Sequence, residues 1–341
     1  RVQAVKPSPT LAITARAAEL RAEGKDVIGL GAGEPDFDTP EHIKKAARKA
    51  IADGKTTYTA VDGTATLKQA IIDKFQRDNG FEYAADQILV SCGGKQSFYN
   101  LAQAILDPGD EVIIPAPYWV SYPDMSILAG GVPVLIHADA EQNFKMSPAQ
   151  LRGALTDNTR LVVINSPSNP TGMAYSLDEL AALGEVLREH PKVVIATDDM
   201  YEHIRWNLDV PFVNILNACP DLANRTLVLN GVSKAYSMTG WRIGYAAGPA
   251  NVIKAMKKIQ SQSTSNPTSI SQYAAEAALN GPQDCIGEML EQFKKRHDYV
   301  VDRLNGMSGI ECLPTDGTFY VFPSVKGLID AIDEVNDDLQ L

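Results

Sequence analysis

Between residues 87 and 248, short apolar runs alternate with segments of helical periodicity, and this alternation constrains the possible fold more than any other feature. The runs predict strands at 88–91, 111–114, 132–135, 161–165, 193–197 and 226–229. Helices are predicted between them at 94–106, 122–129 and 177–189. Short buried strands separated by helices are typical of a mainly parallel, doubly wound sheet, so the sequence predicts an α/β fold.

Distinctive residues follow the predicted strands directly. They are CGGK at 92–95, PAPYW at 115–119, NSPSN at 165–169, Asp198, and the pair Ser233-Lys234. In doubly wound sheets, ligands bind outside the carboxyl ends of the strands. The sequence therefore predicts one binding site at this edge of the sheet.

The stretch NGVSKAYSMTGWRIGYAAG, residues 230–248, carries the most reactive pair of side chains. Lys234 has no charged neighbour in sequence, and burial would lower the pKa of its amine and leave it able to form a Schiff base. Arg242, eight positions later, offers a forked cation suited to a phosphate. Taken alone, a lysine near an arginine is more often a surface pair; together with a phosphate clamp, a Schiff-base lysine is what pyridoxal 5′-phosphate (PLP) requires.

Other residues at this edge match the remaining needs of PLP. Asp198 could keep the ring nitrogen protonated, although an aspartate after a strand can also cap a helix. Asn169 and Tyr201 could donate to the phenolate oxygen, although Asn before Pro is also an ordinary turn. The sequence GGKQ at 93–96 opens a predicted helix whose free amides suit a phosphate. Trp119 could stack on the ring, although a lone tryptophan is more often part of a core.

Read in order, these motifs resemble a known family. They are GGK (93–95), PYW (117–119), NPTG (169–172), DDMY (198–201) and SKAYSMTGWRIG (233–244). The order resembles the fold-type-I, PLP-dependent aminotransferases, most of all the bacterial aspartate aminotransferase subgroup, some members of which also use prephenate. The resemblance runs from about residue 2 to residue 321, and the lysine–arginine motif with NPTG is highly specific.

The resemblance implies a fold and a reaction. The expected fold is the PLP-dependent transferase type I fold, with a mainly parallel, seven-stranded-type sheet in a large domain and a smaller α+β domain. The expected reaction moves the amino group of aspartate or glutamate to a 2-oxo acid in a ping-pong cycle. Prephenate, aromatic or kynurenine aminotransferases and aminocyclopropanecarboxylate synthase share this fold and stay open as alternatives.

The resemblance also assigns roles around the cofactor. Lys234 would bind PLP covalently and, as free amine, move the proton between the substrate Cα and the cofactor C4′. Asp198 would hold the ring nitrogen, and Asn169 and Tyr201 would bond the phenolate oxygen. Ser233, beside the lysine, is counted among the cofactor contacts.

The phosphate would be held by Arg242 and by the backbone amides of Gly94 and Lys95. The family often has a serine three positions before the lysine, and Gly231 stands there instead, so one phosphate contact is expected to be absent. Tyr58 matches a tyrosine that reaches the phosphate of the neighbouring subunit. A homodimer with shared active sites is therefore expected.

Substrate contacts are expected from five residues. Gly33 would present its backbone to the α-carboxylate, and Trp119 and Asn169 would face the substrate as well as the cofactor. Lys95 matches a position that meets the distal carboxylate and favours an acidic substrate, and Lys6 matches an arm lysine linked to dicarboxylic or prephenate-like substrates. Either lysine could also be a solvated surface residue, Lys6 more readily than Lys95.

Three segments are expected in the domain organisation: an N-terminal arm and small-domain segment (1–35), a large PLP-binding domain (36–282), and an interdomain helix with a partial small domain (283–341). The arm is expected to be extended to about residue 12, with a helix at 14–23, strand-like segments at 27–30 and 317–321, and a long helix at 283–306. The family's late F-R-[IL]-S segment, whose arginine clamps the α-carboxylate, is not found before Leu341. We therefore expect the small domain to be truncated at its C-terminal part.

Composition narrows the classes of partner and compartment that fit this chain. The net charge of −11, without a long basic run, argues against nucleic acid as a partner and against a PLP-binding effector module of a transcription regulator, which would carry a winged helix ahead of the arm. The four cysteines show no C-x-x-C or metal-ligand spacing, so no metal is expected and the compartment is expected to be reducing and cytoplasmic. No stretch approaches eighteen apolar residues, so no membrane segment is expected. Nucleotide-binding glycine motifs are absent after the strands.

Overall fold

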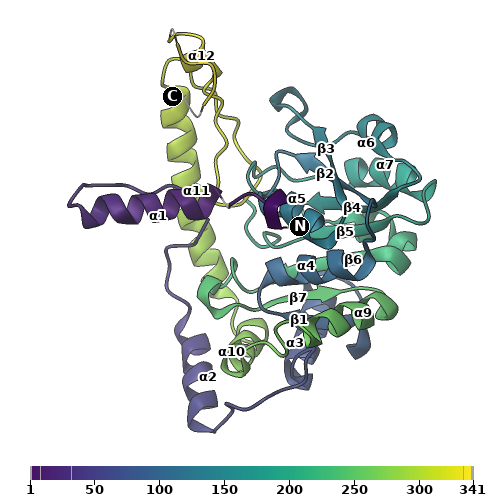
Figure 1. Cartoon of the computed structure of the whole chain (residues 1–341). Coiled ribbons are helices and arrows are strands. Elements are labelled where there is room, and N and C mark those ends of the chain that lie inside the picture. The colour runs from purple at the N-terminus through teal and green to yellow at the C-terminus, as the bar shows by residue number, and fades with distance from the viewer. Residues whose placement is uncertain (1, 8, 32, 333, 339–341) are drawn as a thin grey trace.

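A seven-stranded sheet organises the molecule (Figure 1), as the computed structural model shows for residues 2–7, 9–31, 33–332 and 334–338. The strands are β1 (Ile88–Ser91), β2 (Glu111–Ala116), β3 (Val132–His137), β4 (Thr159–Asn165), β5 (Val194–Asp198), β6 (Thr226–Gly231) and β7 (Gly244–Ala247). Their order is β1-β7-β6-β5-β4-β2-β3. Only β7 runs antiparallel to its neighbours, β1 and β6, while the other adjacent strands are parallel. The mainly parallel sheet expected from the sequence is confirmed.

Helices cover both faces of this sheet. The α-helices are α1 (Pro9–Ala22), α2 (Glu41–Ala52), α3 (Ala65–Asn79), α4 (Gly94–Ile105), α5 (Ser121–Ala129), α6 (Pro148–Ala154), α7 (Leu177–Arg188), α8 (Ile215–Ala218), α9 (Ala250–Ser261), α10 (Ser269–Asn280), α11 (Asp284–Asn305) and α12 (Lys326–Ile329). Single 3-10 turns are η1 (Val2–Ala4), η2 (Ala85–Gln87), η3 (Ala140–Gln142), η4 (Pro220–Arg225) and η5 (Thr239–Trp241).

Alternate residues of each strand enter different cores, which is why the apolar runs are nearly continuous. Leu89 of β1 packs with α4, α5 and α9, whereas Ile88 and Val90 pack on the other face with α2, α3, α7 and α10. Successive strand side chains point to opposite faces, so a strand buried on both sides needs apolar residues at nearly every position. The two cores hold the sheet rigid and fix where its strands end.

The long helix α11 stands beside the sheet and crosses α1 in the view of Figure 1. Its residues Met289, Leu290 and Phe293 pack against Tyr201 and Ile204, which follow β5. The segment after β5 is therefore clamped between the sheet and α11.

Three expectations at the two ends of the chain were wrong in detail. Helix α1 begins at Pro9 and not near residue 14, because proline is accepted in the first turn of a helix, where its missing N–H has no partner to lose. Residues 27–30 form no strand, and Ile28 and Leu30 are exposed. Residues 317–321 contribute one isolated bridge, between Arg205 and Gly317, and no strand.

Sequence reasoning also missed elements. It did not separate β7 from the motif around Arg242, because four residues with two alanines and a glycine carry no strand pattern of their own. Helices α6, α9 and α10 were not predicted.

Among the described residues, no helix has both the length and the apolar character needed to cross a membrane. The division into segments 1–35, 36–282 and 283–341 stays a prediction; all seven strands lie inside the middle segment.

Candidate active site

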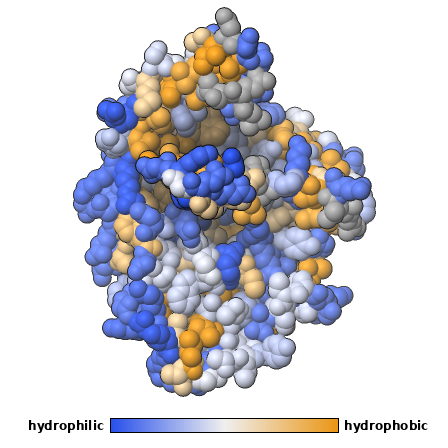
Figure 2. Space-filling model, turned by 60° about the vertical axis from the view of Figure 1, so that its left-hand side comes forward, coloured by the Kyte–Doolittle hydropathy of each residue, from blue (hydrophilic) through white to orange (hydrophobic). Residues whose placement is uncertain are grey.

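A cavity of about 660 Å³ opens at the carboxyl ends of β4, β5 and β6. Its lining combines residues from the strand ends, from the start of α4 and from α1: Thr10, Leu11, Thr14, Gly31, Gly33, Glu34, Gly94, Lys95, Tyr118, Trp119, Val120, Tyr122, Asn165, Asn169, Pro170, Asp198, Met200, Tyr201, Ser233, Lys234, Thr239, Arg242 and Tyr320. In Figure 2, which brings α1 forward, this helix lies in front of a hollow in the molecule. Of the twelve residues that the sequence assigned to the cofactor and substrate sites, ten line this cavity, and Lys6 and Tyr58 do not.

Lys234 projects into this cavity from the loop after β6. Its Nζ donates a hydrogen bond to the backbone oxygen of Gly33 at 2.5 Å. The pKa of Lys234 is lowered to about 8: burial lowers it most, Arg242 also lowers it, and the carboxylates of Glu34 and Asp198 oppose the shift. At pH 7 such a lysine is a neutral amine in about a tenth of the molecules, far more than a solvated lysine, and the neutral amine is the nucleophile.

Asp198 ends β5 and turns its carboxylate toward the cavity. Its Oδ2 accepts a hydrogen bond from the Tyr122 hydroxyl at 2.5 Å, and its Oδ1 accepts one from the Met200 amide at 3.2 Å. Burial raises the pKa of Asp198, and the Tyr122 hydrogen bond and the charge of Lys234 act against that rise.

The adjacent Asp199 points away from the cavity, as the alternation of a strand predicts. It accepts hydrogen bonds from Thr197 and from Asn214, at 2.7 and 2.6 Å. Burial raises the pKa of Asp199 to about 7. The two neighbouring aspartates therefore serve different parts of the molecule, and only Asp198 faces the ligand.

Asn169 and Tyr201 meet a third residue that the sequence did not single out, Tyr320. The Tyr320 hydroxyl lies 2.8 Å from the Tyr201 hydroxyl and accepts a hydrogen bond from Asn169 Nδ2 at 3.5 Å. Tyr320 also leans so closely on the backbone at Gly33 that a Cβ there would lie 2.9 Å from its Cζ. No local pattern marks Tyr320, because it reaches the site only after α11 has brought the end of the chain back to the sheet.

The start of α4 and Arg242 form the cationic side of the cavity. Gly93 has φ 86° and ψ 162°, a conformation open in practice only to glycine, and a Cβ there would lie 2.8 Å from the Arg242 Cζ. Arg242 is held by a hydrogen bond from Nη1 to the Thr239 oxygen at 2.7 Å. Gly94 begins the helix, so its free amides face the same side as the guanidinium. This arrangement suits an anionic group.

Ser233 and Gly231 differ in what they offer to that anion. The Ser233 hydroxyl is buried and lacks a hydrogen-bond partner among the described residues. At Gly231 a Cβ would lie 3.0 Å from the Ile243 oxygen and from the Gly244 Cα, because β6 and β7 approach closely there. A serine in place of Gly231 would not fit without a shift of these strands, whereas Ser233 retains an unused donor at the cavity.

Trp119 and Lys95, the second residue of α4, contact each other in the cavity lining. The Lys95 ammonium lies 5.2 Å from the centre of the Trp119 ring, within the range of a cation–π contact. Trp119 in turn stands perpendicular to Tyr122, with ring centres 5.1 Å apart. The indole therefore has a fixed orientation and a cation beside it.

Tyr58 and Lys6 are not among the residues that line the cavity. Tyr58 is 90% exposed on the loop before α3, and Lys6 is an exposed residue whose backbone amide donates to Asp124 Oδ1 at 3.4 Å. Within this single chain the structure does not bring them to Lys234. Their assigned contacts stay predictions.

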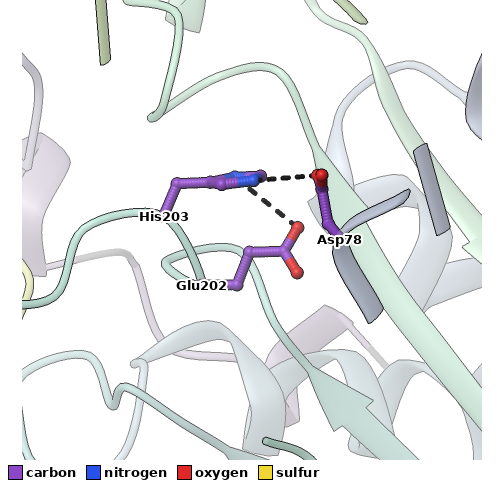
Figure 3. A group of neighbouring side chains, drawn as sticks. All are labelled: Asp78, Glu202 and His203. Atoms are coloured by element: carbon purple, nitrogen blue, oxygen red, sulfur yellow. Dashed lines mark hydrogen bonds and ion pairs between the residues drawn. The ribbon is translucent and has the colours of Figure 1, made fainter. Parts of the chain in front are cut away.

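A second polar cluster lies behind the site, where Asp78, Glu202 and His203 could each offer a ligand atom to a metal ion (Figure 3). His203 Nε2 lies 3.1 Å from Asp78 Oδ2, and Lys74 and Arg77 form ion pairs with Glu202 and Asp78. Burial opposes ionisation of both acids, but these basic partners outweigh it and lower the pKa of each carboxyl. With its negative charge already compensated by two cations, the cluster is best described as a structural network.

Comparison with known proteins identifies the family to which the chain belongs. Residues 25–339 match the family model described as aminotransferase class I and II. An aspartate/prephenate aminotransferase of Nitrosomonas europaea is 64% identical over 333 residues, which cover 98% of this chain and 84% of that protein.

Solved structures agree with the sequence relatives. The aspartate aminotransferase of Rhizobium meliloti superposes with a TM-score of 0.95 at 51% identity, covering 99% of this chain and 85% of that chain. The aspartate aminotransferase of Thermus thermophilus with maleate gives a TM-score of 0.89 at 44% identity, covering 94% and 83%. The type I fold expected from the motifs is therefore confirmed, and the chain belongs to the aminotransferase class I and II family.

Proposed function

We propose that this aminotransferase transfers the amino group of aspartate or glutamate to a 2-oxo acid, with PLP bound covalently at Lys234. One observation carries the proposal: the partly desolvated amine of Lys234 opens into the same cavity as Asp198 and Arg242. An amine, a carboxylate and a guanidinium in one pocket are the three groups that the aldehyde, the ring nitrogen and the phosphate of PLP require.

The residues present fit the cofactor. The unpartnered Ser233 hydroxyl, the first amides of α4 and the Arg242 guanidinium would hold the phosphate. Asp198 would hold the ring nitrogen, and Trp119 would lie along the ring. When bound, PLP supplies an electron sink for the carbanion that forms at the substrate Cα.

The chain's own contribution is proton transfer, orientation and exclusion of water. Lys234 Nζ would take the proton from the substrate Cα and deliver it to the cofactor C4′, a role that suits an amine whose pKa lies near 8. The Gly33 oxygen, which now accepts from Nζ, would keep the amine aimed at the cavity. Tyr201, Asn169 and Tyr320 form a donor group that could hold an oxygen of the ligand.

An acidic substrate is supported by the charges in the cavity. Its lining holds three basic side chains (Lys95, Lys234 and Arg242) and two acidic ones (Glu34 and Asp198) in a chain whose net charge is −11, so the site is more positive than the chain as a whole. Such a local field attracts dianionic substrates. The names of the relatives also favour aspartate as donor.

Prephenate is the second candidate. The relatives from Nitrosomonas europaea and Cereibacter sphaeroides, at 64% and 58% identity, are named aspartate/prephenate aminotransferases. Prephenate carries two carboxylates, as aspartate and glutamate do, and the cavity of about 660 Å³ can admit a ligand larger than aspartate. Thr10, Leu11 and Thr14 of α1 would then contact the bulkier substrate.

We also propose a cytoplasmic homodimer with shared active sites. Tyr58 is a large aromatic residue that is 90% exposed, and a partner subunit would give it a contact surface. The four cysteines are all free thiols, which agrees with a reducing compartment.

Absorption spectroscopy tests the cofactor, the lysine and the donor together. The purified protein with PLP is expected to show the near-visible band of a lysine-bound pyridoxal, and aspartate is expected to replace it with the near-ultraviolet band of the pyridoxamine form. Lys234→Ala is the control and should lack the near-visible band. No band in the unsubstituted protein would refute the PLP site, and a band that neither aspartate nor glutamate changes would refute the acidic donor.

A further inference from the structure

Tyr122 makes a contact with Asp198 that neither the motifs nor the family resemblance assigned. It is the second residue of α5 and is 2% exposed. Its hydroxyl lies 2.5 Å from Asp198 Oδ2, and because a carboxylate can only accept, the tyrosine is the donor. Hydrogen bonds of this length between a hydroxyl and a carboxylate are among the stronger ones in proteins.

Tyr122 is held rigidly in this orientation. Its ring packs against Phe98, with ring centres 4.9 Å apart, and stands at 90° to Trp119. The backbone of Tyr122 is held as well. Its amide donates to the Trp119 backbone oxygen at 3.1 Å, and its backbone oxygen accepts a hydrogen bond from the Ser126 hydroxyl at 2.8 Å. The phenol therefore cannot turn away from Asp198 without disturbing the start of α5.

The two oxygens of Asp198 are thus fixed from the protein side, by the phenol at Oδ2 and by the Met200 amide at Oδ1. Each oxygen of a carboxylate has a second acceptor position, so both remain able to accept from a ligand. The other titratable groups around Asp198 are Lys234, Tyr201 and the neighbouring Asp199.

We propose that Tyr122 is a positioning residue of the active site, which fixes the Asp198 carboxylate and favours its ionised form, so that Asp198 can hold a protonated ring nitrogen. This inference rests on the proposed function, because it concerns how the chain treats the ring of PLP. Tyr122 also links two residues of the cavity lining, since it contacts both Asp198 and Trp119.

The physical reason is the competition between burial and hydrogen bonding at Asp198. Burial disfavours the charged carboxylate, and a donor to the carboxylate favours it. Without the phenol, only the Met200 amide would hold the Asp198 carboxylate, which would be less firmly oriented and less firmly ionised. It would then hold the ring nitrogen and its positive charge more weakly.

Tyr122→Phe removes only the hydroxyl and keeps the ring contacts with Phe98 and Trp119. A matched control is Tyr83→Phe, because the Tyr83 hydroxyl is also buried but lacks a hydrogen-bond partner among the described residues and does not belong to the cavity lining. Three quantities are measured for each variant: the Kd for PLP, the pH midpoint of the near-visible absorption change of lysine-bound PLP, and kcat with aspartate. Circular dichroism and Tm report folding.

We expect Tyr122→Phe to fold, to raise the Kd for PLP and to lower kcat, each by roughly ten- to a hundredfold, the loss typical of a hydrogen bond to a charged group. The spectral midpoint should move to higher pH, because less positive charge on the ring nitrogen makes the nearby lysine linkage easier to protonate. Tyr83→Phe should match the unsubstituted protein in all three. If Tyr122→Phe matches it too while the unsubstituted protein binds PLP, the inference is overturned and the proposed function stands; if the unsubstituted protein binds no PLP, the proposed function itself fails.

A double-mutant cycle with Asp198→Asn separates positioning from general packing. If Tyr122 acts through Asp198, adding Tyr122→Phe to Asp198→Asn should change the Kd for PLP by less than twofold. A full, additive loss in the double variant would show that Tyr122 acts independently of Asp198 and would overturn the inference. The cycle also gives an answer if Tyr122→Phe lowers Tm. A loss of PLP affinity that comes only from weaker folding would appear in the Asp198→Asn background too, whereas a loss that acts through Asp198 would not.

Discussion

At the scale of single residues, the reactivity of Lys234 reflects the competition between burial and charge. Burial removes water from the ammonium, and Arg242 adds a like charge nearby; both lower the pKa, while Glu34 and Asp198 raise it. The balance leaves the pKa at about 8, well below the usual value for lysine. The neutral amine is the form that attacks an aldehyde, so the balance should be visible as a pH dependence.

We predict that the rate at which the PLP-free protein captures PLP at limiting concentration rises with pH and levels off with a midpoint near 8. Below the midpoint the fraction of neutral amine falls about tenfold for each pH unit, and above it the amine is already neutral. Stopped-flow absorption at the near-visible band gives the rate, and Lys234→Ala should show no such phase. A midpoint near 10 would contradict the prediction, because it would mean that the lysine is solvated.

Sequence reasoning located the site residues that stand in short motifs after strands, such as Lys234, Asp198 and Arg242. Their neighbours in sequence are informative because the turn after a strand fixes both the side chain and its surroundings. Tyr122 and Tyr320 were not found, since their hydroxyls meet Asp198 and Tyr201 only through the tertiary packing of α5 and of the segment after α11. An aromatic residue with a buried hydroxyl looks in sequence like any core residue.

At the scale of elements, the start of α4 shows how backbone geometry prepares the cationic side of the cavity. The chain turns from β1 into α4 through Gly93, and the Arg242 guanidinium occupies the space where a Cβ would lie. Any other residue at this position would strain the turn and push the guanidinium away from the helix start.

We therefore predict that Gly93→Ala raises the Kd for PLP by about tenfold or more, since the phosphate would lose a charge-assisted contact, and lowers Tm as well. Gly109→Ala is the matched control: Gly109 also has a positive φ, 95°, but a Cβ there would meet nothing within 4 Å. The control should lower Tm and leave the Kd for PLP unchanged. Equal Kd values for the two variants would show that Arg242 does not depend on the space at Gly93.

Among the elements, the sequence predicted the central strands closely, because a strand buried on both faces must be apolar throughout and must end where polar residues begin. β1 matches residue for residue, and β2, β4 and β6 differ by one or two residues at an end. The segments 27–30 and 317–321 were predicted to be strand-like but form no strand, and they lie outside the sheet that helices cover on both faces. These apolar runs pair with no strand in the described structure, and Leu30 is 93% exposed, so composition alone could not show whether a partner strand exists.

At the scale of the whole molecule, the loop before α3 presents Tyr58 in a fixed position although the side chain itself has almost no contact. The buried Gln272 of α10 accepts from the Thr64 amide at 2.8 Å and donates to the Thr59 hydroxyl at 3.0 Å. A loop tied down in this way holds an aromatic residue out in solvent at a cost that a partner surface would remove. This geometry supports the proposal that Tyr58 completes the site of a second subunit.

Mixed dimers test that proposal directly. Two differently tagged chains, one with Lys234→Ala and one with Tyr58→Ala, are co-expressed, and dimers carrying both tags are isolated. If each site takes its lysine from one subunit and its tyrosine from the other, every mixed dimer has one site with both substitutions and one intact site, so it should retain about half of the unsubstituted activity. The Lys234→Ala homodimer should be inactive, and the Tyr58→Ala homodimer should bind PLP more weakly.

If the sites are not shared, the mixed dimer contains no intact site. It then has half the activity of the Tyr58→Ala homodimer, and its remaining site shows the same weakened Kd for PLP as that homodimer. Tyr299→Ala, at another exposed tyrosine, serves as the control for loss of a surface aromatic and should leave the Kd for PLP unchanged. Because Tyr58 lies outside the cavity lining of its own chain, a restored site in the mixed dimer can come only from a tyrosine that reaches across to the partner.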